Sequence, residues 1–532
     1  MATRVVGVGF IFSLKIALIL GSIFALGDIA AAQVSVTTWH YDNARTGANQ
    51  NETLLFPGGV NPVTFGKLFE QPVDGAIVGQ ALYMPNLTIA KKGVHNVVFV
   101  ATMHDSVYAF DADSAAGRNA APLWHRSFLL PGVTTVPIAM QGCGNITGWT
   151  EVGILSTPVL DPVSKILYVV AKTHENSTFV HRLHALDART GRDKLGSPVV
   201  IQATFQLAGH TYTFQNDVQI NRPALLLEQG NVYIAFGSNG CRNTAQGWVI
   251  AYNYNAATLK PTLKPTLKPM GAFCDEPGIG GAGIWQKGGG LSADSQGFIY
   301  AETADGPFSP GTSFGQSVFK LVQEKSTNTL QLADWFAPFN ESFVDLNDLD
   351  LNDPVLILPD QPSPPLHLAI AVGKQGTIYV LDRDNMGKFC ATCTLKDTQI
   401  VQELPLQAGF ETGALVFWNN SVYTTPLAAD TMVFDLNGGW LNTAASAHSV
   451  KLASEHSPVL SANGTSDGIL WQLSGANLLA LDAVTLQKLY SSAQAAGARD
   501  KLPPLPHFAN LVVANGKVYI GTNSSLAVFG LF

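Results

Sequence analysis

Charge is scarce in this sequence of 532 residues. Asp, Glu, Lys and Arg make up only 13% of the chain, against roughly 25% in an average soluble domain. A disordered chain is excluded, because disorder needs few apolar residues and 46% of this sequence is hydrophobic. A coiled coil is excluded because it would be rich in Glu, Lys and Leu. The formal net charge of −8 argues against a nucleic-acid partner, which would need a surplus of Lys and Arg.

Helical periodicity is nearly absent, and so are the motifs of several enzyme classes. The chain has no G-x-x-x-x-G-K-[ST] loop for nucleotide phosphates and no H-E-x-x-H zinc motif. The glycine-rich run 278–283 is similar to a dinucleotide fingerprint, but it lacks the βαβ setting, so we interpret it as a loop. Nucleotide-dependent and zinc-protease functions are therefore not supported.

A long apolar run occurs at the N-terminus. Arg4 and Lys15 supply positive charge, residues 16–26 are apolar, and three alanines end at Ala32. This order predicts a secretory signal peptide over residues 1–32, cleaved after Ala32. An uncleaved anchor is the alternative, although Lys15 leaves the apolar run short for a membrane span. We expect a periplasmic or extracellular protein without a transmembrane segment after cleavage.

What the sequence does contain is a strand pattern repeated eight times. Runs rich in Val, Ile, Tyr and Phe are bounded by Gly, Asn and Asp, which is typical of strands joined by turns. The third strand of each unit ends in Leu-Asp-Ala or a variant. The eight copies lie at 107–111, 183–187, 249–253, 317–321, 378–382, 431–435, 478–482 and 525–529. Their spacing is that of a propeller blade with variable loops.

We therefore predict one all-β domain over residues 33–532, a single eight-bladed β-propeller of four-stranded antiparallel blades, and we expect a monomer. The eighth unit stops at Phe532 after its third strand. We expect the N-terminal segment 65–75 to supply the missing strand and close the ring, which removes exposed sheet edges. Segment 256–269 contains Thr-Leu-Lys-Pro three times, and we interpret it as a low-complexity polar loop because Pro blocks sheet pairing.

Cysteine is rare, with five residues in the chain. The C-x-x-C spacing of Cys390 and Cys393 predicts a small loop disulfide. A redox site or haem attachment is the alternative, but the βαβ setting and the following His that these sites need are missing. If a second disulfide forms, we expect it between Cys241 and Cys274, because these residues flank the same repeat.

The repeats resemble those of the pyrroloquinoline-quinone (PQQ) propellers, whose unit reads about V-Y-V-G-x-x-D-G-x-L-Y-A-L-D-A-x-T-G-x-x-x-W. Segments 185–191 and 480–485 match this unit, and Asp111, Gly117 and Trp124 match it after an insertion. The stretch 39–61 is similar to the opening of quinoprotein alcohol dehydrogenases. The resemblance implies the propeller fold and, for an active member, PQQ and calcium as cofactors. The adjacent Cys-Cys pair that cofactor-binding members place above the quinone is missing.

Candidate site residues lie in the loops between second and third strands and between successive blades. These loops share one face of a propeller, where function usually collects. The candidates for acid–base catalysis are His104, Asp105 and Asp305. The candidates for contacts with a cofactor are Trp149, Trp285 and Lys374, and those for calcium are Glu151, Asp345, Asp348 and Asp350. An ordinary turn or surface residue is the alternative for each of them.

The sequence does not decide whether the chain is an enzyme. It leaves three functions open. The first is a secreted binding or scaffold protein that contacts a protein or glycan through the loop-rich face. The second is a PQQ- and calcium-dependent quinoprotein dehydrogenase that oxidises an alcohol or sugar. A hydrolase or lyase is a third, supported only by scattered carboxylates, because a fold does not fix a function.

Overall fold

Strands dominate the computed structural model, which describes residues 1–3, 33–140, 149–238, 245–255, 266–278, 280–406, 413–427, 429–451 and 456–532. Within these residues there is one α-helix, α1 (Glu341–Leu346), and several single turns of 3-10 helix. Residues 34–532 form one compact unit. No helix among the described residues is long and apolar enough to cross a membrane. The predicted signal peptide lies almost entirely outside the described residues.

The described strands form eight antiparallel blades, as predicted, and each of the eight predicted third strands lies in one of them. Blade 1 consists of β3 (Leu82–Ile89), β4 (Gly93–Thr102), β5 (Ser106–Asp111) and β6 (Trp124–Ser127), and blade 2 of β9 (Val159–Asp161), β10 (Ile166–Glu175), β11 (Thr178–Asp187) and β12 (Val199–Val200). Blade 3 consists of β16 (Leu226–Glu228), β17 (Asn231–Ser238), β18 (Trp248–Asn255) and β19 (Thr266–Cys274), and blade 4 of β20 (Ser292–Ala293), β21 (Ile299–Glu302), β24 (Val318–Glu324) and β25 (Thr329–Phe336).

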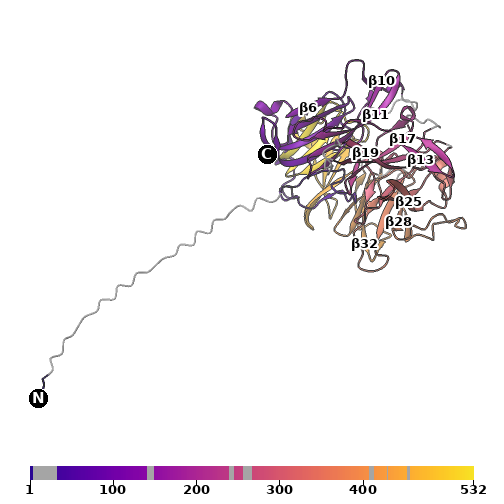
Figure 1. Cartoon of the computed structure of the whole chain (residues 1–532). Helices are drawn as coiled ribbons and strands as arrows, with labels where there is room; N and C mark the ends of the chain where they lie inside the picture. The colour runs from indigo at the N-terminus through magenta and orange to yellow at the C-terminus, as the bar shows by residue number, and fades with distance from the viewer. Residues whose placement is uncertain are drawn as a thin grey trace. The chain divides into compact units, whose positions relative to one another are not determined.

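Blades 5 to 8 follow the same order (Figure 1). Blade 5 consists of β26 (Leu356–Ile357), β27 (Leu368–Val372), β28 (Thr377–Asp382) and β29 (Gln402–Pro405), and blade 6 of β30 (Val416–Trp418), β31 (Ser421–Thr424), β32 (Asp430–Asn437) and the outer pair β33 (Trp440–Leu441) and β34 (Ala447–Lys451). Blade 7 consists of β35 (Val459–Asn463), β36 (Ser466–Ser474), β37 (Asn477–Asp482) and β38 (Lys488–Ser491), and blade 8 of β39 (Leu511–Ala514), β40 (Lys517–Gly521), β41 (Ser525–Leu531) and β2 (Phe65–Pro72).

Short accessory strands extend some blades or pair beside them. The pair β7 (Thr134–Pro137) and β8 (Glu151–Val152) extends blade 2, and β15 (Gln219–Ile220) extends blade 3. Two further hairpins pair only with themselves among the described strands. They are β13 (Thr204–Leu207) with β14 (His210–Thr213), and β22 (Phe308–Ser309) with β23 (Ser313–Phe314).

The N-terminal strand β2 closes the ring, as expected. It pairs antiparallel with β41, from Phe65 opposite Leu531 to Pro72 opposite Ser525. Figure 1 shows the yellow C-terminal strands beside the indigo strands of the first blade. The first and last parts of the chain therefore share one sheet, and β2 supplies the fourth strand of the last blade.

The repeat motif has a local physical cause. The Asp that ends the third strand accepts backbone hydrogen bonds from the turn that follows, which is favourable turn chemistry for this residue. Asp111 Oδ1 accepts from Asp113 N (3.0 Å) and Ser114 N (2.9 Å), and Asp482 Oδ1 accepts from Thr485 N (2.8 Å). Both faces of a blade are covered by its neighbours, so all eight residues of β17 are buried.

A segment near the N-terminus, 34–52, reaches the first strand of every blade. Its short strand β1 (Ala48–Asn49) pairs parallel with β35. Backbone or side-chain hydrogen bonds from the segment reach Tyr83, Leu160, Leu227, Ala293, Ile357, Phe417, Leu460 and Val513, one residue in each blade in turn. Because it touches all eight blades, the segment ties the inner strands of the ring together.

Arg45 organises this segment. It is buried, its Nε donates to Leu291 O (2.8 Å), and its Nη1 donates to Trp39 O (2.7 Å). Burial lowers the pKa of Arg45 to about 10, so the guanidinium stays charged at neutral pH. His40 stacks on Trp39 with 3.6 Å between ring centroids, and burial lowers the pKa of His40 to about 3. The imidazole is therefore neutral.

One boundary differs from the prediction. Strand β19 begins at Thr266, so the last Thr-Leu-Lys-Pro copy is in a strand and not in a loop. Leu267 is buried, and Pro269 lies opposite Tyr252 next to an irregularity in the pairing of β18 and β19. The outermost strand of a blade tolerates Pro because its missing N–H need not serve the sheet. Residues 256–265 lie outside the described part of the chain.

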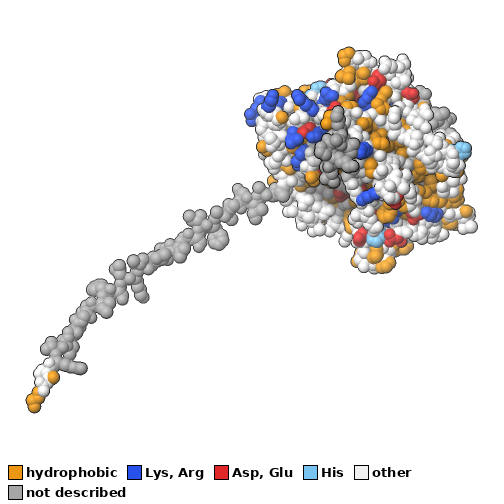
Figure 2. Space-filling view, viewed as in Figure 1, with side chains coloured by type: hydrophobic (Ala, Val, Ile, Leu, Met, Phe, Trp, Pro, Cys, Tyr) orange, Lys and Arg blue, Asp and Glu red, His pale blue; other side chains and the backbone are white. Residues whose placement is uncertain are grey.

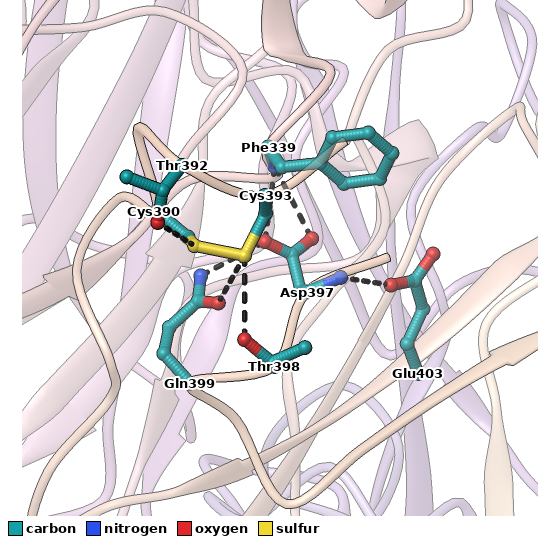
Figure 3. The surroundings of a disulfide bond; sticks show 8 residues. All are labelled: Phe339, Cys390, Thr392, Cys393, Asp397, Thr398, Gln399 and Glu403. Atoms are coloured by element: carbon teal, nitrogen blue, oxygen red, sulfur yellow. Dashed lines mark hydrogen bonds between the residues drawn. A yellow bond between two sulfur atoms is a disulfide. The ribbon is translucent and has the colours of Figure 1, made fainter. Parts of the chain in front are cut away.

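The cysteines are only partly described. Cys390 and Cys393 form a disulfide in the loop after β28 (Figure 3). Cys274 is a buried free thiol, and burial raises its pKa. The Cys241–Cys274 pairing is thus not found, because Cys274 bonds to no other cysteine, and Cys241 itself lies outside the described residues. Cys143 lies outside them as well.

Candidate functional site

The loop face, meaning the side with the loops between second and third strands and between successive blades, carries the predicted site residues in three groups. The first is around His104. Its Nδ1 lies 3.0 Å from Glu151 Oε1, and Thr135 Oγ1 donates to Glu151 Oε2 at 2.6 Å. Glu151 therefore binds neighbours in blades 1 and 2. It does not belong to the group of acidic residues found between blades 4 and 5.

Asp105, next to His104, faces the interior. Its exposed fraction is 0%, and neither carboxylate oxygen has a hydrogen-bond partner with normal geometry among the described residues. Gly153 lies against it, because a Cβ built on this glycine would be 2.8 Å from Asp105 Oδ1. Burial raises the pKa of Asp105 well above its usual value, although the nearby Lys172 opposes the shift. The Asp105 carboxylate is therefore buried, whereas His104 contacts Glu151.

The two predicted stacking rings belong to the second group. Trp149 is 5% exposed and packs in an apolar cluster with Met103, Val152 and Phe508. Trp285 packs against the same cluster. The Arg222 guanidinium lies 4.8 Å from the Trp285 ring centroid and 4.5 Å from that of Phe508, and its Nε donates to Trp285 O at 3.0 Å. Both rings are thus in contact with side chains of the chain itself.

The third group is the acidic cluster, defined as Asp305, Asp348 and Asp350 together with Lys374. One carboxylate oxygen from each of the three aspartates lies within 4.8 Å of the others. Lys374 Nζ is 2.5 Å from Asp348 Oδ1 and 2.7 Å from Asp350 Oδ2. Asp305 comes from the loop of blade 4, Lys374 from the loop of blade 5, and the other two from the segment between these blades. Four residues predicted in three different roles therefore meet at one place.

The electrostatics of the acidic cluster follow from this crowding. Burial and then the Asp350 carboxylate raise the pKa of Asp305 to about 7, while Lys374 opposes the shift. Burial also acts against ionisation of Asp350, but the Lys374 ammonium and hydrogen bonds hold its pKa below the usual value. Near neutral pH, Asp350 is ionised and Asp305 takes up and releases a proton. A carboxyl group with a pKa near neutrality is suited to proton transfer and to pH-dependent binding.

The segment that carries two of the aspartates is held from several sides. Gln316 Nε2 donates to Asp350 Oδ1 at 2.7 Å, and Gly306 N donates to Asp345 Oδ1 at 3.0 Å. Asp345, predicted as a calcium ligand, lies in α1 and receives this backbone hydrogen bond at the edge of the cluster. Lys374 N also donates to Asp350 O at 2.8 Å. Blades 4 and 5 thus share the residues that position the cluster.

The disulfide loop anchors the start of the same segment. Asp397, four residues after Cys393, accepts from Phe339 N with both carboxylate oxygens, at 3.0 and 3.2 Å. Figure 3 shows Asp397 beside the disulfide, between Phe339 and Glu403. Asp397 N donates to Glu403 Oε2 at 2.5 Å. Phe339 comes directly before α1, so this contact ties the disulfide loop of blade 5 to the base of the acidic segment.

Sequence reasoning missed a buried ionic group close to these residues. Glu302 is fully buried at the end of β21, and it accepts hydrogen bonds from Asp353 N (2.9 Å) and Val372 N (3.2 Å). Lys287 Nζ lies 3.1 Å from Asp353 Oδ2. Burial, and then the charge of Asp353, raises the pKa of Glu302 well above its usual value. The available signal was an ionisable residue within an otherwise apolar strand, a type that is almost never buried unless paired.

A second feature of the loop face is the carboxyl pair Asp275 and Glu276, which follows β19. Both residues are fully buried. Burial raises the pKa of Asp275 to about 7, and burial and the neighbouring Asp275 raise the pKa of Glu276 to about 8. Glu276 Oε2 accepts from Ala282 N at 2.9 Å. The pair therefore adds two buried carboxyl groups that stay protonated in mildly acidic solution.

The acidic cluster suits a hard cation such as calcium in one respect only, the type of its ligand atoms. Carboxylate oxygens are the ligands that calcium prefers. The ammonium group of Lys374, however, already contacts two of the three aspartates. A metal ion would have to displace this ammonium group. The cluster therefore carries its own neutralising cation.

No protein-family model matches the chain, and no curated protein matches it. Among solved structures, the chain is similar to the quinohemoprotein alcohol dehydrogenase from Comamonas testosteroni, with 14% identity, a TM-score of 0.60, and coverage of 94% of this chain and 81% of that chain. It is also similar to a europium-containing methanol dehydrogenase, with 12% identity, a TM-score of 0.55, and coverage of 93% and 98%. Identities this low show a shared propeller fold and nothing finer.

The residues predicted to contact a quinone do not form a free binding site. A quinone with carboxylate groups needs an exposed ring on which to stack and cations for its charges. Trp149 is buried, Trp285 contacts Arg222, and Lys374 is paired with Asp348 and Asp350. The surrounding carboxylates would also repel an anionic cofactor. The described arrangement therefore does not fit PQQ.

Proposed function

We propose that the chain is a non-catalytic binding propeller that contacts a protein or glycan partner through its loop face. One observation carries this proposal: the three predicted quinone contacts, Trp149, Trp285 and Lys374, all bind other side chains of the chain. Asp305 and Asp348, which form the acidic cluster with Asp350 and Lys374, are exposed. A partner that presents Lys or Arg side chains, or a glycan with amino groups, would complement these carboxylates.

The proposed interaction depends on pH in a defined direction. The pKa of Asp305 is about 7, so this carboxyl is mostly protonated in mildly acidic solution. As the pH rises through neutrality, Asp305 gains its negative charge. Binding of a cationic partner should therefore strengthen over this range, and it should weaken at high salt because exposed charges are screened.

Charge reversal on the loop face tests the proposal. The parent protein, the double variant Asp305→Lys/Asp348→Lys and the control Glu324→Lys/Asp467→Lys are applied to glycan and peptide arrays. The control changes the same charge away from the loop face, at the half-buried Glu324 and the exposed Asp467. We expect the loop-face variant to lose at least about tenfold in affinity for a bound glycan or peptide, while the control binds like the parent. Equal binding by all three proteins would refute the proposal.

A PQQ- and calcium-dependent dehydrogenase is the second candidate. Two observations favour it: the fold is similar to that of two dehydrogenases, and Asp305 has a pKa of about 7, as a general base requires. The test is to incubate the protein with PQQ and calcium and to record the absorption spectrum and alcohol-dependent dye reduction. Turnover would overturn the binding-only proposal. No cofactor binding at high micromolar concentration would remove the dehydrogenase candidate.

We also propose that the protein is secreted as a monomer after cleavage at Ala32. The Cys390–Cys393 disulfide supports this, because disulfides persist mainly in oxidising compartments. Mass spectrometry of the protein from its native host should find Gln33 as the first residue. An intact N-terminus would contradict cleavage, and a dimer in analytical ultracentrifugation would contradict the monomer.

A further inference from the structure

One cavity of the described structure lies in the wall of the propeller, away from the acidic cluster. Its volume is about 1080 Å³. It is bordered by β19 of blade 3, by β25 of blade 4, and by the two hairpins that pair only with themselves, β13–β14 and β22–β23. No residue of the acidic cluster lines it. The cavity is therefore a separate feature from the site described above.

The lining of this wall cavity is mostly apolar. Its main apolar side chains are Phe205, Phe214, Phe273, Phe314, Leu330 and Leu332. Five amide side chains, Gln202, Gln206, Asn216, Asn328 and Gln331, complete the polar part together with a few Thr residues. None of the described residues that line the cavity carries a formal charge. An apolar wall with a few hydrogen-bonding groups is the usual composition of a small-molecule site.

The cavity is held open by defined contacts. Phe205 of the β13–β14 hairpin meets Phe273 of β19 edge to face, with 5.6 Å between ring centroids, and Phe273 in turn lies 6.2 Å from Phe314. At one border β19 and β25 come together: a Cβ built on Gly271 would lie 2.7 Å from Leu330 N. Gly271 has a φ of +128°, which only glycine adopts readily. Aromatic packing and one close backbone approach thus frame the space.

The chemistry of the lining selects the occupant. Burying a charged group in this cavity would remove its hydration without providing an ionic partner, which is strongly unfavourable. Burying apolar surface is favourable by roughly 25 cal/mol per Å². The amide side chains can satisfy a hydroxyl or carbonyl group of the ligand.

We propose that the wall cavity binds an uncharged, largely apolar small molecule with one or two hydrogen-bonding groups, such as a long-chain alcohol. The β13–β14 hairpin covers one side of this site. The site is independent of the proposed partner contact on the loop face, so either proposal can fail without the other. Bound ligand stabilises the folded protein, because it binds the native and not the unfolded chain.

The experiment uses the full chain and the neutral dye Nile red, whose fluorescence rises in apolar surroundings. We expect saturable binding of one dye per protein. 1-Dodecanol should displace the dye, and dodecanoate should compete at least about tenfold less well, because its carboxylate finds no partner. 1-Dodecanol should also raise the thermal unfolding midpoint.

Two variants locate the dye. Leu207→Trp fills the cavity from the accessory hairpin, and Leu332→Trp fills it from β25; both side chains are half-buried in the parent. Each should weaken dye binding at least about tenfold. Val484→Trp, on blade 7 and 68% exposed, is the matched control and should bind like the parent. Leu207 lies outside the blade sheets, so this variant should unfold like the parent in a thermal scan.

Three outcomes would overturn the proposal. Non-saturable dye binding would show that the parent has no site. Undiminished binding by both cavity variants would place the dye elsewhere. Equal competition by dodecanoate and 1-dodecanol would contradict an uncharged ligand.

Discussion

Asp105 in blade 1 and Asp305 in blade 4 occupy the same place in the repeat and have different surroundings. Each lies three residues after the end of the second strand, at Thr102 in β4 and at Glu302 in β21. Asp105 is fully buried without a well-formed hydrogen bond to its carboxylate, whereas Asp305 is exposed beside Asp348 and Asp350. Burial is the first cause of the raised pKa in both, but only Asp305 has an acidic neighbour as the second. The position of each aspartate follows from the repeat, whereas its surroundings depend on the segment that packs over it.

The two regions also differ in overall charge. Residues 82–200, which include blades 1 and 2, contain ten Lys and Arg against eight Asp and Glu, whereas residues 292–405, which include blades 4 and 5, contain six against fifteen. Figure 2 shows Lys and Arg side chains gathered over the part of the molecule where β6 of blade 1 lies in Figure 1. Loss of water opposes ionisation of both aspartates, and the charge of Asp350 is the next cause for Asp305. For Asp105 the charges of Glu151 and Asp74 add less than the loss of water.

The largest expected effect is a change in the free energy of unfolding when Asp105, the buried one of the two aspartates, is replaced. Asp105→Asn mimics the protonated side chain and removes its titration. The pKa of Asp105 is raised on folding from about 3.8, so the native state holds a proton that the unfolded chain releases. Its contribution to stability is complete below about pH 4 and falls by about 1.4 kcal/mol for each pH unit above it. Relative to the parent, the variant should gain unfolding free energy steadily as the pH rises from about 4 towards the raised pKa of Asp105, as measured by urea unfolding.

The control for this prediction is Asp467→Asn, which changes an exposed residue. It should leave the pH dependence of unfolding unchanged. If Asp105→Asn and the parent lose stability in parallel as the pH rises, Asp105 is ionised in the native state. Asp105 and Asp305 would then differ in burial but not in whether the carboxyl is ionised.

The next-largest effect is expected from Lys374, the cation in the acidic cluster of Asp305. Lys374→Met removes the ammonium group that contacts Asp348 and Asp350 and leaves three carboxylates within reach of one ion. We expect the variant to bind calcium at least about tenfold more tightly than the parent in isothermal titration calorimetry, because carboxylate oxygens suit this ion. Lys388→Met, which removes an exposed lysine paired with Asp334, should bind calcium like the parent. Equal calcium affinity in all three proteins would mean that the cluster does not act as a set of ligands.

The fold could be predicted from the sequence because it rests on local repeats. The Leu-Asp-Ala turns and their variants that end the third strands, such as that at Asp482, recur eight times, so the blades and the closing strand β2 were recognisable. The site was predictable only residue by residue. Asp305, Asp348, Asp350 and Lys374 were all named, but their meeting depends on how two blades and the intervening segment pack. The sequence named His104 and Asp105 as separate candidates for acid–base catalysis, and it could not show that Gly153 packs against Asp105 or that His104 contacts Glu151.

A smaller effect is expected from the acidic neighbour itself. Asp350→Asn removes the charge that, after burial, contributes most to the raised pKa of Asp305. The pKa of Asp305 should fall from about 7 by about one unit, as measured from the carboxyl ¹³C shifts of Asp-labelled protein. The parent Asp350 has a lowered pKa, so it stabilises the fold above the unfolded pKa and this contribution is lost as the pH falls. An unchanged titration of Asp305 would assign its shift to burial alone and would make it equivalent to Asp105.

The smallest effect tests how far the positioning of the cluster extends. Cys390→Ser/Cys393→Ser removes the disulfide from the loop in which Asp397 holds Phe339 N, the residue at the start of the acidic segment. A looser loop should let the segment carrying Asp350 relax away from Asp305, because like charges repel. We expect the pKa of Asp305 to fall by a few tenths of a unit, about 0.3–0.5 kcal/mol. Asp105, which contacts neither the loop nor the segment, should keep its titration. If the pKa of both residues moves together, the disulfide acts on the whole ring, and the local difference between the two aspartates does not depend on the segment that covers each one.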